Sequence, residues 1–478
     1  MDWFAQDLWW GRAVFQRGLA GLYLVAFLCA ANQFRALLGE HGLTPVPPLL
    51  ARTPFRRAPS IFHLHYSDRF LAVVAWTGVG VSAALLAGAG DRVPLWTATA
   101  LWLLLWALYL SIVNVGQIWY AFGWESLLVE AGFLAVFLGN AAVGPPVAVM
   151  WLLRWLLFRL EFGAGLIKMR GDRCRRDLTC LYYHHETQPM PGPLSRLFHL
   201  LPRPLHRAEV LANHVTQLVV PFGLFLPQPV ASVAAGTILV TQLWLVASGN
   251  FSWLNWMAII LAASVIDYSP LLGAGPDAGP GPLWHRALVV AAVALVLVLS
   301  YRPARNLLSR DQLMNYSFNS LRLVNTYGAF GSVTKVRHEI VIEGTRERVL
   351  GPDTVWHEYG FRGKPGDPRR LPPQVAPYHL RLDWLMWFAA MSAPYAHPWL
   401  LTLLGRLLAG DRAVLRLLRH NPFPDAPPVY VRALRYRYRF TDRAQRRATG
   451  ERWRRTLIDE YLPPVALEHA VGRPPRDA

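Results

Sequence analysis

The segment that decides the fold class is VLANHVTQLVVPFGLFLPQPVASVAAGTILVTQLWLVASGNFSWLNWMAIILAASVI, Val210 to Ile266, which contains no Asp, Glu, Lys or Arg. A helix needs roughly 20 apolar residues to span a membrane, so this segment has room for two or three spans. The whole chain agrees, because 53% of its 478 residues are hydrophobic and only 16% are charged, against about 25% charged in soluble proteins. These features indicate a polytopic α-helical membrane protein.

Further apolar runs lie on both sides of that segment. We expect eight or nine transmembrane helices among the runs at residues 18–38, 70–90, 93–115, 126–142, 147–168, 208–227, 230–247, 253–272 and 284–301. The N-terminus lacks the basic start, short apolar core and small-residue cleavage site of a signal peptide, so we expect the first run to remain in the protein.

The character of the chain changes after Tyr301. Residues 302–478 contain 29 Lys and Arg against 16 Asp and Glu, and two stretches alternate as strands do, SVTKVRHEIVIEG at 332–344 and YVRALRYRYRF at 430–440. The sequence therefore predicts two domains, a multi-pass helical domain at 1–301 with a polar loop at 169–207, and a basic, β-rich extramembrane domain at 302–478.

One more uncharged run lies in this second domain, at residues 384–405, and Pro394 and Pro398 interrupt it. We expect a docked or interfacial helix there rather than a further span. The excess of basic residues favours contact with anionic lipid headgroups, at about 1 kcal/mol per residue near the surface. Because the arginines alternate with tyrosines and form no nucleic-acid-binding motif, we expect membrane lipids and no nucleic acid as partners.

Ionisable residues repeat along the run at 147–168. Arg154, Glu161 and Lys168 are seven residues apart, so they share one helical face. Charges at membrane depth are costly and face the bundle interior or a wet cavity. Lys168 precedes all other lysines, and a buried amine can lose its proton, so these residues are candidates for catalysis with Lys168 as base. Alternatively, Arg154 pairs with Glu161, and the side chain of Lys168 extends to the membrane interface.

His214 lies within the uncharged segment. It is a further candidate, either as a proton relay or as a packing residue.

The loop after this run concentrates polar side chains. Our candidates for client or ligand binding are Arg170, Asp172, Tyr182, Tyr183, His184, His185 and Glu186. No His-x-x-x-His or Cys-x-x-Cys spacing frames them, so we expect no metal. Cys174 and Cys180 are six residues apart and form a disulfide only if the loop faces an oxidising compartment. No phosphate-binding loop, dinucleotide fingerprint or nucleophile elbow occurs, so we expect no cofactor.

Long strings, in order along nearly the whole chain, resemble the lipase maturation factor family of multi-pass membrane proteins. They include FRALLGEHGLTPVPPLL (34–50), WESLLVEAGFLAVFLG (124–139), RLEFGAGLIKMRGDRCRRDLTCLYYHHETQPMPGPLS (159–195), LRLVNTYGAFGSVTKVRHEIVIEG (321–344), PYHLRLDWLMWFAA (377–390) and NPFPDAPPVYVRALRYRYRF (421–440). The resemblance implies a chaperone-like factor of the endoplasmic reticulum membrane that helps secreted dimeric lipases, such as lipoprotein lipase, to fold and assemble. The Arg- and Ala-rich composition raises the alternative of a bacterial source, for which we expect the cell membrane.

A second similarity covers only FGAGLIK, residues 162–168. This string is similar to a pattern of the vitamin K-dependent gamma-carboxylase superfamily, where the lysine that matches Lys168 acts as a base in a membrane pocket. The alternative function is therefore an intramembrane enzyme that acts on a lipid or quinone-like substrate, with a transporter third. We favour a non-enzymatic maturation factor, because the first resemblance covers far more of the chain.

Overall fold

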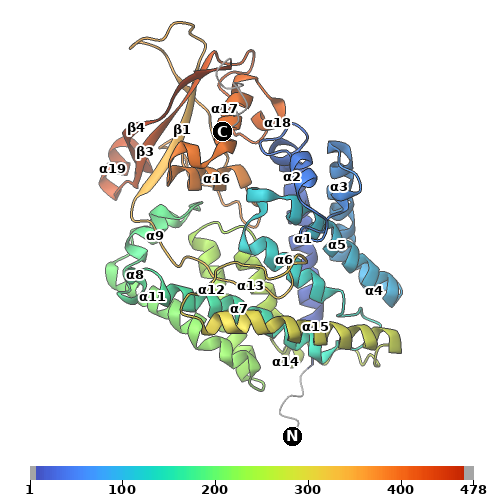
Figure 1. The fold of residues 1–478 in the computed structure, drawn as a ribbon. Helices are drawn as coiled ribbons and strands as arrows, with labels where there is room; N and C mark the ends of the chain where they lie inside the picture. The colour runs from blue at the N-terminus through green and yellow to red at the C-terminus, as the bar shows by residue number, and fades with distance from the viewer. Residues whose placement is uncertain (1–6, 468–478) are drawn as a thin grey trace.

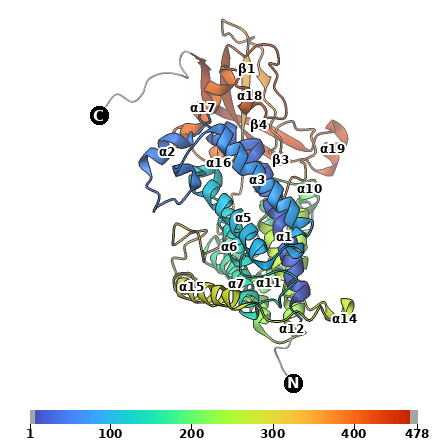
Figure 2. The same cartoon turned by 90° about the vertical axis from the view of Figure 1, so that its right-hand side faces the viewer.

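The computed structural model of the protein describes residues 7–467. Most of the helices form one domain, and a small sheet with its own helices lies at one end of that domain (Figure 1). A quarter turn of the molecule shows the same arrangement, with the sheet above and the helices below (Figure 2).

Five helices are long and apolar enough, by length and composition, to cross a membrane within the described residues. They are α1 (Trp9–Leu38), α3 (Asp68–Leu86), α5 (Leu95–Val115), α12 (Val230–Ser248) and α15 (Leu283–Leu308). Outward side chains of α12 and α15, such as Val240 and Val298, are largely exposed, and lipid is the solvent that such faces require. The protein is therefore a multi-pass integral membrane protein.

The other four predicted runs are also helical, but they do not meet this criterion. They form α6 (Gly123–Ala135), α7 (Val147–Arg170), α11 (Arg203–Leu218) and α13 (Leu254–Ala263). α6 and α13 are 13 and 10 residues long, short of the roughly 20 that a span needs, while α7 carries several charges. The expected count of eight or nine spans is thus not confirmed.

Short helices connect these elements or cap them. They are α2 (Val46–Arg52), η1 (Ile61–His63), α4 (Ala89–Arg92), η2 (Gln117–Tyr120), α8 (Arg173–Arg176), α9 (Leu181–Thr187), α10 (Ser195–His199), η3 (Val220–Phe225) and α14 (Ser269–Leu272). At the centre, α1 packs against α3, α6 and α13. A Cβ atom at Gly132 would lie 1.7 Å from the hydroxyl of Tyr23, so glycine is what lets α6 approach α1 this closely.

The C-terminal part contains a four-stranded antiparallel sheet in the order β2-β1-β3-β4. Its elements are β1 (Arg337–Thr345), β2 (His357–Glu358), α16 (Arg381–Ala390), η4 (Pro394–Ala396), α17 (Pro398–Leu408), α18 (Arg412–Leu415), β3 (Tyr430–Phe440), α19 (Arg443–Thr449) and β4 (Trp453–Ala466). Ile340 of β1 is opposite Arg435 of β3, and Phe440 is opposite Trp453 of β4. Both predicted strands are confirmed, β3 with the predicted bounds and β1 with a later start.

The uncharged run at 384–405 forms parts of two docked helices. α16 packs against β1 and α17 against β3; Pro394 lies in the break between them, and Pro398 is the first residue of α17. Proline has no amide hydrogen and restricts the residue before it, which explains why one continuous helix does not form.

The chain between α15 and β1 returns to the helical domain before it enters the sheet. The Gln312 side-chain amide donates to the carbonyl of Gly163 in α7 at 3.0 Å, and a Cβ at Gly163 would lie 2.5 Å from the Tyr327 carbonyl oxygen. The two glycines of α7 thus serve close approach, since Gly165 is packed equally tightly against Leu218 of α11.

Candidate functional site

A cavity of about 920 Å³ lies where the helical domain meets the polar loop and the C-terminal part. Its walls come from α7, α11, α12, α13, the polar loop, residues 328–334 and α16. Apolar side chains such as Leu160, Leu254 and Phe388 supply most of the surface. A mainly apolar cavity with a few polar groups is the usual form of a small-molecule or lipid site.

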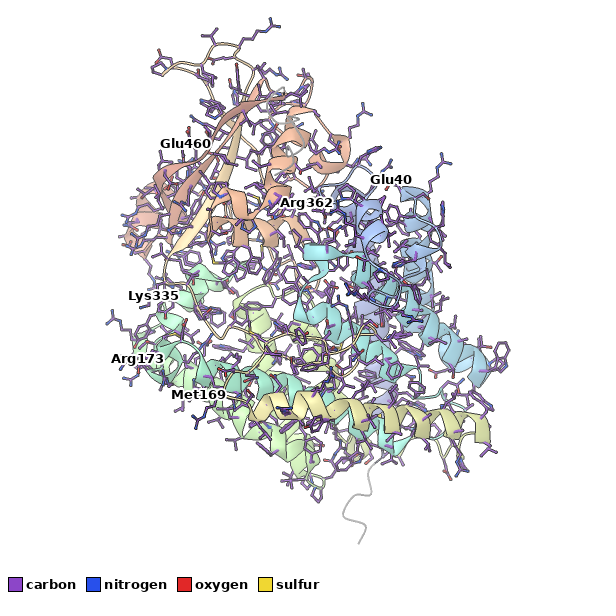
Figure 3. All side chains as sticks on the ribbon, in the orientation of Figure 1. Glu40, Met169, Arg173, Lys335, Arg362 and Glu460 are labelled. Atoms are coloured by element: carbon purple, nitrogen blue, oxygen red, sulfur yellow. A yellow bond between two sulfur atoms is a disulfide. The ribbon has the colours of Figure 1, made fainter. Side chains whose placement is uncertain are left out.

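Two charged residues of α7 line this cavity. Glu161 and Lys168 stand two helical turns apart, and both are buried, at 1% and 6% exposure. The Lys168 ammonium donates to Asn213 Oδ1 at 2.9 Å and to Gln217 Oε1 at 2.8 Å, both from α11. Lys168 thus points inward, whereas the next residue, Met169, projects from the outer surface, as does Arg173 (Figure 3).

The carboxylate of Glu161 is held by neutral amides. It accepts from Gln217 Nε2 at 3.2 Å and from Gln242 Nε2 at 2.6 Å, and Asn255 Nδ2 donates in turn to Gln242 Oε1 at 2.6 Å. Gln217 therefore presents its oxygen to the ammonium and its amide hydrogens to the carboxylate. We call this chain of side chains from Lys168 to Asn255 the amide relay.

Arg154, which the spacing places on the same helical face, makes different contacts. Its guanidinium donates to the Leu224 carbonyl in η3 at 2.9 Å and lies 4.9 Å from the centre of the Trp151 ring. His214 is buried in α11, and its Nε2 is 3.0 Å from the carbonyl oxygen of Arg175. These contacts join α7 to η3 and α11 to the polar loop.

The start of the polar loop is closed by a disulfide between Cys174 and Cys180. Arg170 donates to Gln312 Oε1 at 2.7 Å and to the Leu307 carbonyl at 2.9 Å, while Asp172 accepts from the Val333 amide at 2.6 Å. These contacts attach the loop to the chain that follows α15 at two places, residues 307 and 312 on one side and residue 333 on the other.

The adjacent histidines of α9 face opposite sides. His184 lines the cavity with its ring 5.3 Å from that of Phe330, and burial holds its pKa well below the usual value, so the imidazole is neutral. His185 instead lies against Phe198 and against His206 of α11. Tyr182, at a ring distance of 6.0 Å from His206, is partly exposed.

Tyr183 and Glu186 complete the predicted set. Tyr183 is partly exposed and its carbonyl accepts from Thr187 Oγ1 at 3.1 Å. Glu186 is buried and accepts from the Phe440 amide of β3 at 2.7 Å. Burial raises the pKa of this carboxyl, although the Phe440 amide and nearby arginines oppose the shift. Glu186 therefore joins the loop to the sheet.

A buried arginine of β1 strengthens that junction. Arg337 donates to the carbonyls of Glu186 and Gln188 at 3.0 and 2.5 Å, and it pairs with Glu339, which also pairs with Lys364 at 2.9 Å. All three charged side chains are nearly inaccessible, so a buried cluster of two cations around one carboxylate, with Arg337 donating to loop carbonyls, fastens the polar loop to the sheet.

Sequence reasoning missed a second fastening, between α6 and α16. Arg381 pairs with Glu125 at 2.7 Å, its guanidinium lies 3.4 Å from the centre of the Tyr120 ring, and Tyr109 donates to the same carboxylate. His379 Nδ1 is 3.5 Å from Glu125. The sequence does contain a sign of this pair, because Glu125 directly precedes a predicted span, and an acidic residue at such a position needs a partner.

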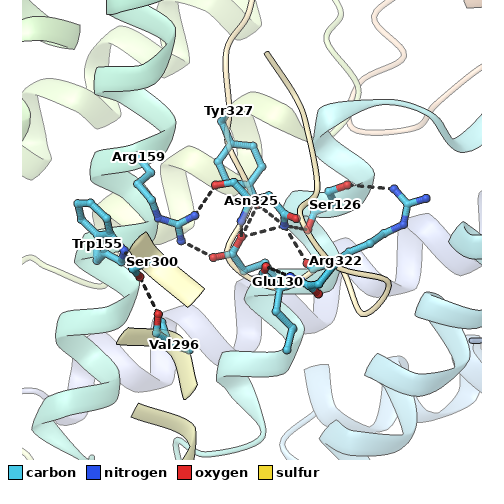
Figure 4. Close-up of polar contacts among 11 residues, drawn as sticks. Ser126, Glu130, Trp155, Arg159, Val296, Ser300, Arg322, Asn325 and Tyr327 are labelled. Carbon is cyan, nitrogen blue, oxygen red and sulfur yellow. Dashed lines mark hydrogen bonds and ion pairs between the residues drawn. The ribbon is translucent and has the colours of Figure 1, made fainter. Parts of the chain in front are cut away.

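A third buried ion pair lies deeper in the helical domain (Figure 4). Glu130 of α6 pairs with Arg159 of α7 and accepts from the Asn325 amide at 2.9 Å and from the Tyr327 hydroxyl at 2.7 Å. Arg159 also donates to the Asn325 carbonyl at 2.6 Å. The segment between α15 and β1, which we call the returning segment, thus supplies neutral hydrogen-bonding groups to an ion pair between two helices of the helical domain.

Comparisons with known proteins match two consecutive parts of the chain. Residues 10–272 match the Lipase maturation factor transmembrane domain, and residues 323–463 match the Lipase maturation factor C-terminal domain. Lipase maturation factor 1 of Bos taurus is 41% identical over 98% of this chain and 91% of its own length, and that of Mus musculus is 42% identical over 96% and 88%.

A more distant relative extends the agreement. Lipase maturation factor 2 of Homo sapiens is 28% identical over 95% of this chain and 82% of its own length. No solved structure matches the chain significantly. Both domains match in order, and the relatives are covered over most of their length. The chain is therefore a member of the lipase maturation factor family.

Proposed function

We propose that this protein assists the folding and assembly of secreted lipases. The observation that carries the proposal is the identity of 41–42% with Lipase maturation factor 1 across both domains. The function is a maturation activity rather than catalysis on a small substrate, because the similarity extends through the whole C-terminal part, which an intramembrane reaction at Lys168 does not require.

The geometry supports a rigid platform for a client. Three buried charge clusters, around Glu125, Glu130 and Glu339, fasten the sheet, the polar loop and the helices to one another. A client that contacts the sheet therefore stays at a fixed position relative to the membrane. Rigid elements position a binding surface more sharply than loops do.

We place the client on the outer face of the sheet, on the exposed Arg170 and on the partly exposed Tyr182 and Tyr183. The sheet face carries a hollow of about 410 Å³ whose lining includes His338, Arg437, Arg439 and Arg454. We call this the basic groove. Clustered guanidinium groups fit carboxylates, so an acidic segment of the lipase is the matching partner. Membrane lipids surround the exposed faces of the spans.

The number of membrane-crossing segments, the domain boundary and the compartment also belong to this proposal. We keep eight or nine membrane-crossing segments by counting α6, α7, α11 and α13 with the five long helices, and we keep residue 301 as the end of the membrane-spanning part. The compartment is the endoplasmic reticulum membrane for a eukaryotic source and the cell membrane for a bacterial one. No nucleic acid or cofactor enters the proposal.

The test uses lipase-secreting cells that lack their own maturation factor. Expression of the full chain should restore lipase activity per amount of secreted lipase, with the inactive lipase shifting to the active assembled form. Replacing Arg437, Arg439 and Arg454 together by Gln should reduce this rescue severalfold. The matched control replaces the exposed Arg443, Arg446 and Arg447 of α19, which removes the same charge from residues that do not line the groove.

Two outcomes separate the parts of the proposal. No rescue by the properly inserted full chain would reject the maturation function itself. Full rescue by the groove variant, equal to that of the α19 control, would reject the groove as the client site and leave the function intact.

A further inference from the structure

Three potential metal ligands converge where the polar loop meets α11. His185 of α9, His206 and Glu209 each offer a ligand atom, and these atoms lie within 4.8 Å of one another. His206 and Glu209 are three residues apart in α11 and therefore share a face. His185 faces them from α9, with its Nε2 4.0 Å from Glu209 Oε1.

The imidazole of His185 is deeply buried. It is 2% exposed, and neither ring nitrogen has a hydrogen-bond partner among residues 7–467. A buried polar group left unpaired costs about 1–3 kcal/mol. Phe198 covers one part of the ring, and the ring of His206 lies 5.9 Å away. Metal coordination would satisfy one of the two ring nitrogens, because the ion accepts the lone pair of that nitrogen.

Outer contacts orient the other two side chains as ligands. His206 Nε2 is 3.3 Å from the His199 carbonyl oxygen, so this nitrogen carries the hydrogen, and the buried Nδ1 presents its lone pair. Trp244 Nε1 donates to Glu209 Oε1 at 2.8 Å, while Glu209 Oε2 is buried and has no hydrogen-bond partner within the described chain. Contacts of this kind fix tautomer and direction in known metal sites.

We propose that His185, His206 and Glu209 bind one divalent transition-metal ion of the zinc class, with water as the fourth ligand. Two imidazoles and one carboxylate suit zinc, whereas calcium and magnesium prefer all-oxygen sites. Ligand atoms around a tetrahedral ion lie about 3.4 Å apart for bonds of about 2.1 Å, so the side chains need to close by roughly 1 Å. The expectation of no metal rested on spacing within the loop, and α11 supplies the ligands that the loop lacks.

The site has a structural consequence that is independent of the proposed function. Glu209 and Trp244 also line the large cavity, so the ion would hold α9 and its disulfide-closed loop against α11 and α12 at the cavity wall.

The test uses the full-length protein in detergent, stripped with a chelator and then titrated with Zn²⁺ in a calorimeter. We expect one ion per chain. His185→Ala and Glu209→Gln should each weaken binding by about 100-fold or more, and Trp244→Phe, which removes only the outer contact, by about 10-fold. The matched control is His41→Gln, an exposed histidine outside the site, which should keep wild-type affinity and stoichiometry.

A second readout covers the case in which a ligand variant fails to fold. Co²⁺ bound to the wild-type protein should show the intense visible absorption of a four-coordinate ion. Stoichiometric Zn²⁺ binding with this spectrum supports the site. A wild-type protein with no stoichiometric Zn²⁺, a Co²⁺ spectrum equal to that of the free hydrated ion, or wild-type affinity in a folded His185→Ala variant would each reject it.

Discussion

Buried charges occur in two different settings in the helical domain, and the contrast separates fastening from binding. Around Glu125 a carboxylate meets Arg381 directly, with Tyr109 as an added donor and almost no exposed surface. Around Glu161 a carboxylate and the Lys168 ammonium are joined through the neutral Gln217, beside a large cavity. Direct pairing compensates the charges within the protein. The amide relay leaves them less compensated and within reach of a ligand, which is the arrangement of a binding site.

The largest effect should follow from breaking the direct pair. Arg381→Met leaves Glu125 buried beside a neutral side chain and should reduce the free energy of unfolding by about 3–5 kcal/mol. We expect aggregation or a much lower melting temperature in detergent, measured by thermal unfolding. Adding Glu125→Leu should recover part of the loss, because the uncompensated charge is then removed. A single Arg381→Met variant as stable as wild type would show that this pair fastens nothing.

The disulfide should have the next largest effect. Replacing Cys174 and Cys180 by Ser opens a loop with a sequence separation of six, for which chain entropy predicts about 2 kcal/mol. Arg175 lies within this loop and lines the cavity, so ligand binding at the relay should weaken along with stability. The measurement is thermal unfolding with and without reductant. The serine variant serves as control, because reductant should change nothing in it.

The relay should respond in activity more than in stability. Lys168→Met removes the ammonium while water or neighbouring groups can still reach Asn213 and Gln217, so the loss of stability should be about 1 kcal/mol. Rescue of lipase activity should fall severalfold. Lys168→Arg keeps a permanent charge and should retain most of the rescue if the role is electrostatic.

The pair of Lys168 variants distinguishes three roles. Loss in both substitutions, with normal insertion, would favour a base and therefore the enzymatic alternative. Full rescue by both would show that the relay is not required for maturation. A role as a charge that positions a ligand requires that Lys168→Met loses rescue of lipase activity and that Lys168→Arg retains it.

The smallest effect should come from an ion pair on the sheet surface. Arg435 pairs with Asp459, and the two side chains are 29% and 41% exposed. Solvent screens such pairs, so Arg435→Gln should change the free energy of unfolding by less than about 1 kcal/mol. Thermal unfolding at low and high salt checks this prediction. A loss of stability as large as that of Arg381→Met would show that the exposed fraction of an ion pair does not predict how much the pair stabilises the protein.

Sequence reasoning reached some parts of this architecture for clear physical reasons. Strand alternation located β3 to the residue, and the seven-residue spacing placed Glu161 and Lys168 on a common side of α7. The number of spans was less accessible, because apolar runs such as 126–142 and 253–272 end as short buried helices once tertiary contacts form. Hydropathy does not distinguish a helix buried in protein from one buried in lipid.

The partners of the charged residues could not be predicted from the sequence. Gln217 and Gln242 are neutral, lie on other helices and carry no periodic signal. His206 and Glu209 are three residues apart in α11, but only the fold brings His185 to them. Pairings across such distances depend on how the helices pack, which the local pattern does not contain.

The contacts between early residues of the helical domain and later parts of the chain have a consequence for the order of events during synthesis. Glu125 leaves the ribosome 256 residues before Arg381, and Glu130 leaves 195 residues before Asn325. At about 5–20 residues per second, Glu125 waits roughly 10–50 s for its partner. During that interval the Glu125 carboxylate lacks its cationic partner, so the junction of α6 with α16 forms only after the C-terminal part has been made. A protein proposed to help others mature thus depends, for its own maturation, on the last third of its chain.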